Sequence, residues 1–110
     1  MKLPNANQAV VDLRKLQDYC LNQEHPRGQH KARLFKGALG LTAQDALELQ
    51  HVLLGAAKGE DAVSLGADDY GQRYAVDFSI KRTSGQATIR SLWIIRSGEE
   101  FPRLATCYIL

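Results

Sequence analysis

The residue pattern of this chain changes its period about two thirds of the way along, and this change restricts the folds that the chain can adopt. In residues 73–80, the large apolar residues Tyr74, Val76, Phe78 and Ile80 occupy every second position. Such alternation is typical of a β-strand with one buried face. Upstream, apolar residues recur every three or four positions, as in amphipathic helices. A helical first half followed by a β second half predicts an α+β fold.

Three helices are expected before residue 60. The first is expected over residues 12–21, with Asp12 as its N-cap. The second is expected over residues 29–40, because an apolar stripe runs up to Gly40, a residue type that ends helices. The third is expected over residues 42–59, where a Thr and an Asp three positions later form a capping-box pattern.

Three strands are clear in the second half, at residues 73–80, 87–96 and 104–110. The polar stretch before them leaves open a fourth, short strand at residues 62–65, and residues 9–11 could pair as a short edge strand. Helices and strands segregated in this way favour helices on one side of an antiparallel sheet. We therefore expect two to three N-terminal helices packed on one face of a three- to four-stranded antiparallel sheet.

The length and composition suit one ordinary globular domain. The 110 residues are 45% hydrophobic and 24% charged, and we expect a single domain over residues 1–110, with a helical half at about 12–58 and a sheet half at about 62–110. No apolar stretch approaches the roughly 20 residues that span a membrane. The first residues lack the apolar region of a signal peptide. The expected location is therefore the cell interior, without membrane association.

The net charge of +2 says little, but its distribution is uneven. Basic residues gather in residues 24–36 and 73–96, whereas residues 42–69 are mainly acidic. If the second helix and the sheet line one cleft, that cleft is basic and suits a polyanion such as RNA. A scattered, solvated distribution of the same charges remains open.

Several classes of site are disfavoured by what the sequence lacks. Cys20 and Cys107 lie far apart and are expected to be free, buried thiols. His25 is expected to be a loop residue and His51 a surface residue, and the histidines show no metal-ligand spacing. The chain has no Walker loop and no GxGxxG, GxSxG or CxxC motif. Neither a metal nor a cofactor is therefore expected.

The segment around His30 and Lys31 is the first candidate for chemistry. It lies at the expected start of the second helix, where unpaired backbone N–H groups favour an anion. Histidine can transfer a proton near neutral pH, and Arg27 and Arg33 add positive charge nearby. These groups could hold a phosphate and take a proton from a hydroxyl. A solvated histidine at a helix start is the plainer interpretation.

The strand at residues 87–96 is the second candidate. Ser91 and Trp93 are two positions apart and share one face. A hydroxyl beside an aromatic plane suits a phosphate oxygen and a stacked base, although both side chains could equally belong to the core. On the last strand, Thr106 and Tyr108 could contribute hydroxyls close to Ser91, or could simply be β-favouring residues.

Taken together, these segments resemble a small uncharacterised bacterial domain that occurs alone and at the ends of phage and polymorphic-toxin proteins. The resemblance covers nearly the whole chain and is carried by Tyr19-Cys20-Leu21-Asn22, residues 25–35, residues 70–74, Arg90-Ser91-Leu92-Trp93, Pro102-Arg103-Leu104 and Thr106-Cys107-Tyr108. The layout also resembles the barnase–EndoU–colicin–RelE group of ribonuclease toxins. His30-Lys31 and Ser91-Leu92-Trp93 are similar to elements of its colicin D-like members.

This second resemblance implies a metal-independent ribonuclease that cleaves RNA, tRNA included, by attack of the 2′-hydroxyl to leave a 2′,3′-cyclic phosphate. It implies that His30 is the general base or acid and that Lys31 and Arg90 stabilise the charged transition state. Ser91 and Thr106 would then hydrogen-bond the phosphate. The remaining expected substrate contacts are Arg27, Arg33, Trp93 and Tyr108.

A toxin of this kind further implies a protein partner, namely a small acidic immunity protein or antitoxin that covers the cleft. It implies action in the cytoplasm, either of the producing cell or of a target cell into which the domain is delivered. Two other functions remain open, a non-catalytic protein-interaction module and a simple nucleic-acid-binding domain.

Overall fold

The helices precede the strands along the chain, as the change of residue period predicts, and the α+β prediction is confirmed. The computed structural model describes all residues 1–110. The helical elements are η1 (Ala6–Gln8), α1 (Leu13–Lys15) with its π-helical continuation η2 (Leu16–Cys20), α2 (Gln29–Leu39), η3 (Ala43–Asp45) and α3 (Ala46–Gly59). The strands are β1 (Ala62–Asp68), β2 (Gly71–Arg82), β3 (Gly85–Arg96) and β4 (Arg103–Ile109).

The four strands form one antiparallel sheet in the order β1-β2-β3-β4. The strand left open at residues 62–65 therefore exists and extends to Asp68. The expected edge strand at residues 9–11 is reduced to one parallel bridge between Val10 and Arg103. No helix is both long and apolar enough to cross a membrane.

Capping residues set the helix ends where the sequence predicts them. The Asp12 carboxylate accepts a hydrogen bond from the Arg14 N–H at 3.0 Å and caps α1. At the other end of α2, Gly40 has φ 67°, a left-handed conformation that glycine adopts without strain. Thr42 and Asp45 form the predicted capping box before α3.

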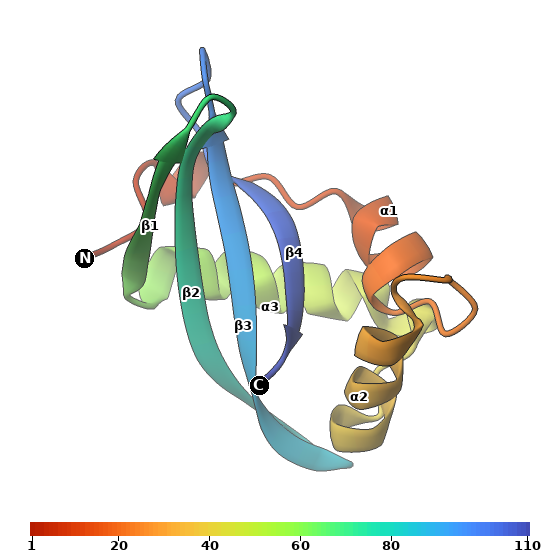
Figure 1. The fold of residues 1–110 in the computed structure, drawn as a ribbon. Helices are drawn as coiled ribbons and strands as arrows, with labels where there is room; N and C mark the ends of the chain where they lie inside the picture. Colours follow the sequence, from red (N-terminus) through yellow and green to blue (C-terminus); the bar gives the residue numbers. More distant parts are fainter.

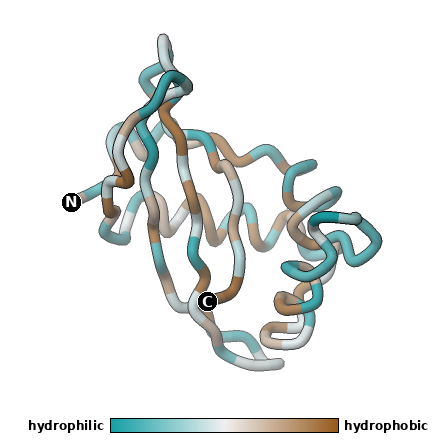
Figure 2. The backbone as a smooth tube through the Cα atoms, viewed as in Figure 1, coloured by the Kyte–Doolittle hydropathy of each residue, from teal (hydrophilic) through white to brown (hydrophobic).

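The helices are unevenly distributed around the sheet (Figure 1). Helix α3 crosses behind one face, whereas α1, η2 and α2 stand beside the β4 edge. Hydrophobic and hydrophilic residues alternate along the central strands, and the loop that leads into α2 is hydrophilic (Figure 2). In β2 the alternation is realised as predicted, since Val76 and Phe78 are buried and Asp77 and Ser79 are exposed.

One face of the sheet therefore remains uncovered, and we call it the open face. Residues that pair across neighbouring strands lie on the same face, so the registers assign its members directly. The registers place on it Val63 of β1, Arg73, Ala75 and Asp77 of β2, Arg90, Leu92 and Ile94 of β3, and Thr106 and Tyr108 of β4. Leu65, at the register shift in β1, lines the same face.

Gly28, which precedes α2, lies against η2, and this contact allows a sharp test of the packing. A β-carbon at Gly28 would collide with the carbonyl oxygen of Tyr19. We expect Gly28→Ala to lower the free energy of unfolding by about 1–3 kcal/mol, as overpacking does. Urea denaturation measures this change.

The control is Gly37→Ala within α2, where an added β-carbon meets nothing within 4 Å. Because alanine favours helix over glycine, Gly37→Ala should raise the free energy of unfolding by up to about 1 kcal/mol. Equal stability of the two variants would contradict the packing of Gly28 on Tyr19.

Candidate functional site

Lys31 is the centre of a polar cluster where α2 meets β4. Its ammonium donates hydrogen bonds to Thr106 Oγ1 at 3.1 Å and to the Tyr19 hydroxyl at 3.3 Å. It also lies 5.0 Å from the ring centroid of Tyr19 and 5.7 Å from that of Tyr108, within the range of cation–π attraction. With Arg90 of β3, these residues form what we call the Lys31 cluster.

Lys31 is half-buried and has no acidic partner. None of the six ion pairs of the chain includes it. An ammonium carries three hydrogen-bond donors, and the hydroxyls of Tyr19 and Thr106 take two of them. The third donor and the full positive charge remain for another group. A partly desolvated cation in such a setting attracts an anion.

Arg90 extends the cluster across the open face. Its guanidinium forms two hydrogen bonds of 2.8 Å with the two carboxylate oxygens of Asp77 on β2. This pairing lowers the pKa of Asp77 and raises that of Arg90, to which Tyr108 contributes as a smaller cause. Tyr108 is directly opposite Arg90 in the register of β3 and β4. Arg90 is therefore a fixed cation held beside a phenol.

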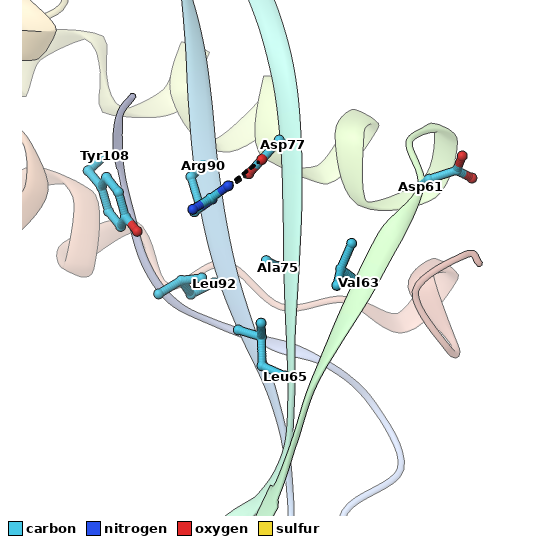
Figure 3. Close-up of a pocket in the computed structure, with 8 residues that line it drawn as sticks. All are labelled: Asp61, Val63, Leu65, Ala75, Asp77, Arg90, Leu92 and Tyr108. Carbon is cyan, nitrogen blue, oxygen red and sulfur yellow. Dashed lines mark hydrogen bonds and ion pairs between the residues drawn. The ribbon is translucent and has the colours of Figure 1, made fainter.

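An apolar hollow of about 390 Å³ adjoins the Arg90–Asp77 pair on the open face. Its wall includes Val63 and Leu65, two exposed residues of the edge strand β1. Figure 3 shows Tyr108 at one side of the hollow and the Arg90–Asp77 pair at its end, whereas the Asp61 carboxylate points away. The full lining is Asp61, Val63, Leu65, Ala75, Asp77, Arg90, Leu92 and Tyr108.

His25 contacts the other side of the Lys31 cluster. Its ring meets the Tyr19 ring edge to face, with centroids 4.9 Å apart. Its Nδ1 accepts the backbone N–H groups of Arg27 and Gly28, each at 3.0 Å. In the neutral ring the proton is therefore on Nε2, which is left as a donor. The sequence predicted only a loop residue at His25, and nothing local in the sequence indicates that Tyr19 belongs to the site.

Ser91 and Trp93, two of the predicted site residues, lie in the core and not on the open face. Ser91 is 0% and Trp93 1% exposed. The Ser91 hydroxyl donates to the carbonyl oxygen of Val76 at 2.7 Å and accepts from Trp93 Nε1–H at 2.9 Å. Both side chains already have their partners inside the protein. We expected Ser91 to contact a phosphate and Trp93 to contact a base. This is corrected, because the two side chains form a hydrogen-bonded pair on the covered face of the sheet.

The predicted residues at the start of α2 are divided by the helix geometry. Successive residues project about 100° apart around a helix, so Lys31 faces the sheet while His30 is exposed to solvent. Arg27 and Arg33 are exposed as well, and Arg33 donates to Gln29 at 3.4 Å. The structure thus brings together Lys31, Thr106, Tyr108 and Arg90 but joins neither His30 nor the two arginines to them by a hydrogen bond.

No group of three or more His, Cys, Asp or Glu side chains is placed to hold a metal ion. Among known proteins, the model of one family, described as a domain of unknown function (DUF6883), matches residues 2–110. The chain therefore belongs to the DUF6883 family. Neither a curated protein nor a solved structure matches it.

The structural role of Ser91 can be separated from a catalytic one. We expect Ser91→Ala to lower the free energy of unfolding by about 1–3 kcal/mol, because Trp93 Nε1–H would be left in the core without an acceptor. The control is Ser79→Ala on the same sheet, where the hydroxyl contacts Thr88 at an exposed position. That substitution should change stability by at most about 0.5 kcal/mol. If thermal and urea unfolding show the two variants to be equally stable, the assigned role of Ser91 is wrong.

Proposed function

We propose that this member of the DUF6883 family is a metal-independent ribonuclease domain of toxin type, which binds a phosphate of RNA at the Lys31 cluster. One observation carries the proposal, the half-buried ammonium of Lys31 held by two hydroxyls with no carboxylate partner. A cation placed in this way has an unsatisfied donor and an uncompensated charge. Both suit a phosphate that becomes more negative during the reaction.

The reaction would proceed by attack of the 2′-hydroxyl on the adjacent phosphorus, which expels the 5′-oxygen and leaves a 2′,3′-cyclic phosphate. Lys31 and Arg90 would stabilise the extra negative charge of the transition state. Thr106 and Tyr108 carry hydroxyls on the same face and would orient the phosphate oxygens. Fixed donors aimed at developing charge lower the barrier because they need no reorganisation.

Proton transfer would fall to a histidine, and the hydrogen bonds of the two candidates favour His30 over His25. Because Nδ1 of His25 accepts two backbone N–H groups, its ring is held in the neutral form with the proton on Nε2. That Nε2–H can donate a hydrogen bond to a phosphate oxygen, but it cannot release its proton, because the ring would become an anion. His30 adjoins Lys31 in the chain and is exposed, so its ring can take the proton of the 2′-hydroxyl and return one to the 5′-oxygen.

The apolar hollow beside Arg90 supports RNA as the substrate. It is adjacent to the cationic groups and is lined largely by aliphatic side chains, so that it suits the flat face of a base. A nucleotide whose phosphate contacts Lys31 and Arg90 would place its base toward Leu92 and Ala75. Base and phosphate would then be bound on one continuous surface.

A toxin of this type would require an inhibitory partner, and the open face offers the place for it. A small acidic immunity protein or antitoxin would pair with Lys31 and cover Val63 and Leu65, which are 64% and 54% exposed. The same exposed apolar residues favour the second candidate function, a protein-interaction module without catalysis.

Substitution of Lys31 tests the proposed activity. We expect Lys31→Met to reduce cleavage of an RNA mixture containing tRNA by about 10²–10³-fold in EDTA, because a charge aimed at the phosphate is lost while the aliphatic packing is kept. The control is Lys36→Met, an exposed lysine on the same helix, which should retain activity within a few-fold. Gel analysis of the products, with their cyclic phosphate ends, measures the effect.

Cleavage by Lys31→Met at the rate of the unsubstituted protein would remove Lys31 from the site. Absence of cleavage of any RNA by the unsubstituted protein would reject the ribonuclease proposal. Salt-sensitive RNA binding without cleavage would then indicate a nucleic-acid-binding domain.

A second test compares the two histidines. We expect His30→Asn to slow RNA cleavage by about 10²–10⁴-fold, as loss of a general acid or base does. His25→Asn keeps an acceptor for the backbone N–H groups of Arg27 and Gly28 and should leave cleavage within a few-fold of the unsubstituted rate. The reverse ranking in the same cleavage assay would assign the proton transfer to His25.

A further inference from the structure

A second hollow, of about 510 Å³, lies where β3 ends and β4 begins. This end of the sheet is opposite the hairpin of β2 and β3 (Figure 1). We call it the basic hollow, because four of its ten lining residues are basic and one is acidic. The charged lining residues come from α1, the β1–β2 turn and the three neighbouring strands, and are Lys15, Asp69, Arg73, Arg96 and Arg103.

Two of the four bases have no carboxylate partner. Lys15 and Arg96 take part in none of the six ion pairs of the chain, whereas the other two bases are held by carboxylates at 3.0 and 2.9 Å. When these two carboxylates and Asp69 are counted, four bases still stand against three acids. Lys15 is also half-buried, so that its ammonium has lost part of its hydration. The basic hollow therefore attracts an anion.

Tyr70 adds an aromatic ring to the same lining. The residue is 73% exposed, although the turn that carries it is fixed by hydrogen bonds. Its backbone N–H donates to the Asp68 carboxylate at 2.9 Å, and its carbonyl oxygen accepts the Ser97 N–H at 2.9 Å. A large ring that is exposed on an ordered turn contributes little to the core. It is free to stack on the flat face of a base.

The basic hollow and the Lys31 cluster lie on one continuous surface. Side chains of a strand alternate between its faces, so Arg96 of β3 shares the open face with Arg90 and Leu92. Leu92 pairs with Thr106 of the Lys31 cluster. From Leu92 to Arg96 the strand advances by roughly 13 Å, at about 3.3 Å per residue. A short nucleic-acid strand that is bound at one of the two sites can therefore extend to the other.

We propose that the basic hollow is a second nucleotide-binding subsite, in which Lys15 and Arg96 bind a phosphate and Tyr70 stacks on an unpaired base of the same RNA strand. This inference rests on the proposed ribonuclease function and specifies its substrate as single-stranded RNA. In a duplex the bases are stacked on one another and their faces are closed to a tyrosine ring, whereas the bases of loops and ends are accessible.

The test titrates the complete chain with two uncleavable probes, a dinucleotide and a hexanucleotide of 2′-O-methyluridine, and follows the backbone amide signals by NMR. The methyl group blocks the hydroxyl that would attack the phosphorus. We expect the dinucleotide to shift signals around Thr106 and Tyr108 only. The hexanucleotide should also shift those of Tyr70, Arg96 and Ser97, and should bind at least about 10-fold more tightly because it occupies both sites.

Substitutions distinguish the cations of the basic hollow from its aromatic ring. The double variant Lys15→Met/Arg96→Gln should weaken binding of the hexanucleotide by about 10-fold and leave that of the dinucleotide within about two-fold. It should also reduce the slope of log Kd against log salt concentration by about 0.7 for a lost phosphate contact. Tyr70→Ala should weaken binding of the hexanucleotide by roughly 5–100-fold, with the salt dependence unchanged.

The control is the double variant Lys36→Met/Lys58→Met. It removes two exposed charges from α2 and α3, and neither residue takes part in an ion pair. The net charge changes by the same amount as in Lys15→Met/Arg96→Gln. We expect this control to bind both probes as the unsubstituted protein does. Equal weakening of hexanucleotide binding by the two double variants would reduce the basic hollow to a general effect of charge and overturn the subsite.

Further results that overturn this inference differ from those that overturn the proposed function. Equal affinity of the unsubstituted protein for the two probes, or no binding of the hexanucleotide, would reject the second subsite. Unchanged binding by Tyr70→Ala would reject the stacked base and the assignment of single-stranded RNA. If Lys31→Met binds the dinucleotide as the unsubstituted protein does, the phosphate site of the proposed function fails instead, and the hexanucleotide still decides on the basic hollow.

Discussion

The arrangement of this protein depends on a sheet that is covered on one face only. Side chains of a strand point alternately to opposite faces. Successive residues of β3 therefore lie alternately in the core and on the open face. Ser91 and Trp93 enter the core beside α3, whereas Arg90 and Leu92 remain on the open face. The same division separates Cys107 from Thr106 and Tyr108 in β4. Core and candidate site are therefore the two sides of the same short strands.

Lys31 connects these two sides because α2 stands beside the β4 edge rather than behind the sheet. From this position its side chain reaches around the edge to Thr106 while the neighbouring Ala32 and Phe35 fill the core. Withdrawing an ammonium from water is costly unless other groups replace the lost hydration. Two hydroxyls and two aromatic rings do so in part. The remaining charge is what makes the position suitable for an anionic ligand.

The elements that were predictable from the sequence are those that local chemistry determines. The cap at Asp12, the glycine at the end of α2 and the alternation in β2 are properties of a few adjacent residues. The face on which Ser91 and Trp93 lie was not predictable, because β3 carries apolar residues on both faces and nothing local indicates which one α3 covers. Lys31, Thr106, Tyr108 and Arg90 were identified by residue type and resemblance, but their grouping depends on the register of β3 and β4.

Long-range contacts account for what the sequence did not indicate. The Tyr19–His25 pair depends on a loop whose turn is closed by backbone bonds to a histidine ring, and the contact of Cys20 with Thr106 depends on the docking of η2 against β4. The hydroxyl oxygen of Thr106 contacts both Lys31 and Cys20. A phosphate at Lys31 would bring negative charge close to Cys20 and disfavour its ionised form, which raises the pKa of Cys20. Linkage requires the converse as well: ionisation of Cys20 would weaken phosphate binding at Lys31 by the same coupling free energy.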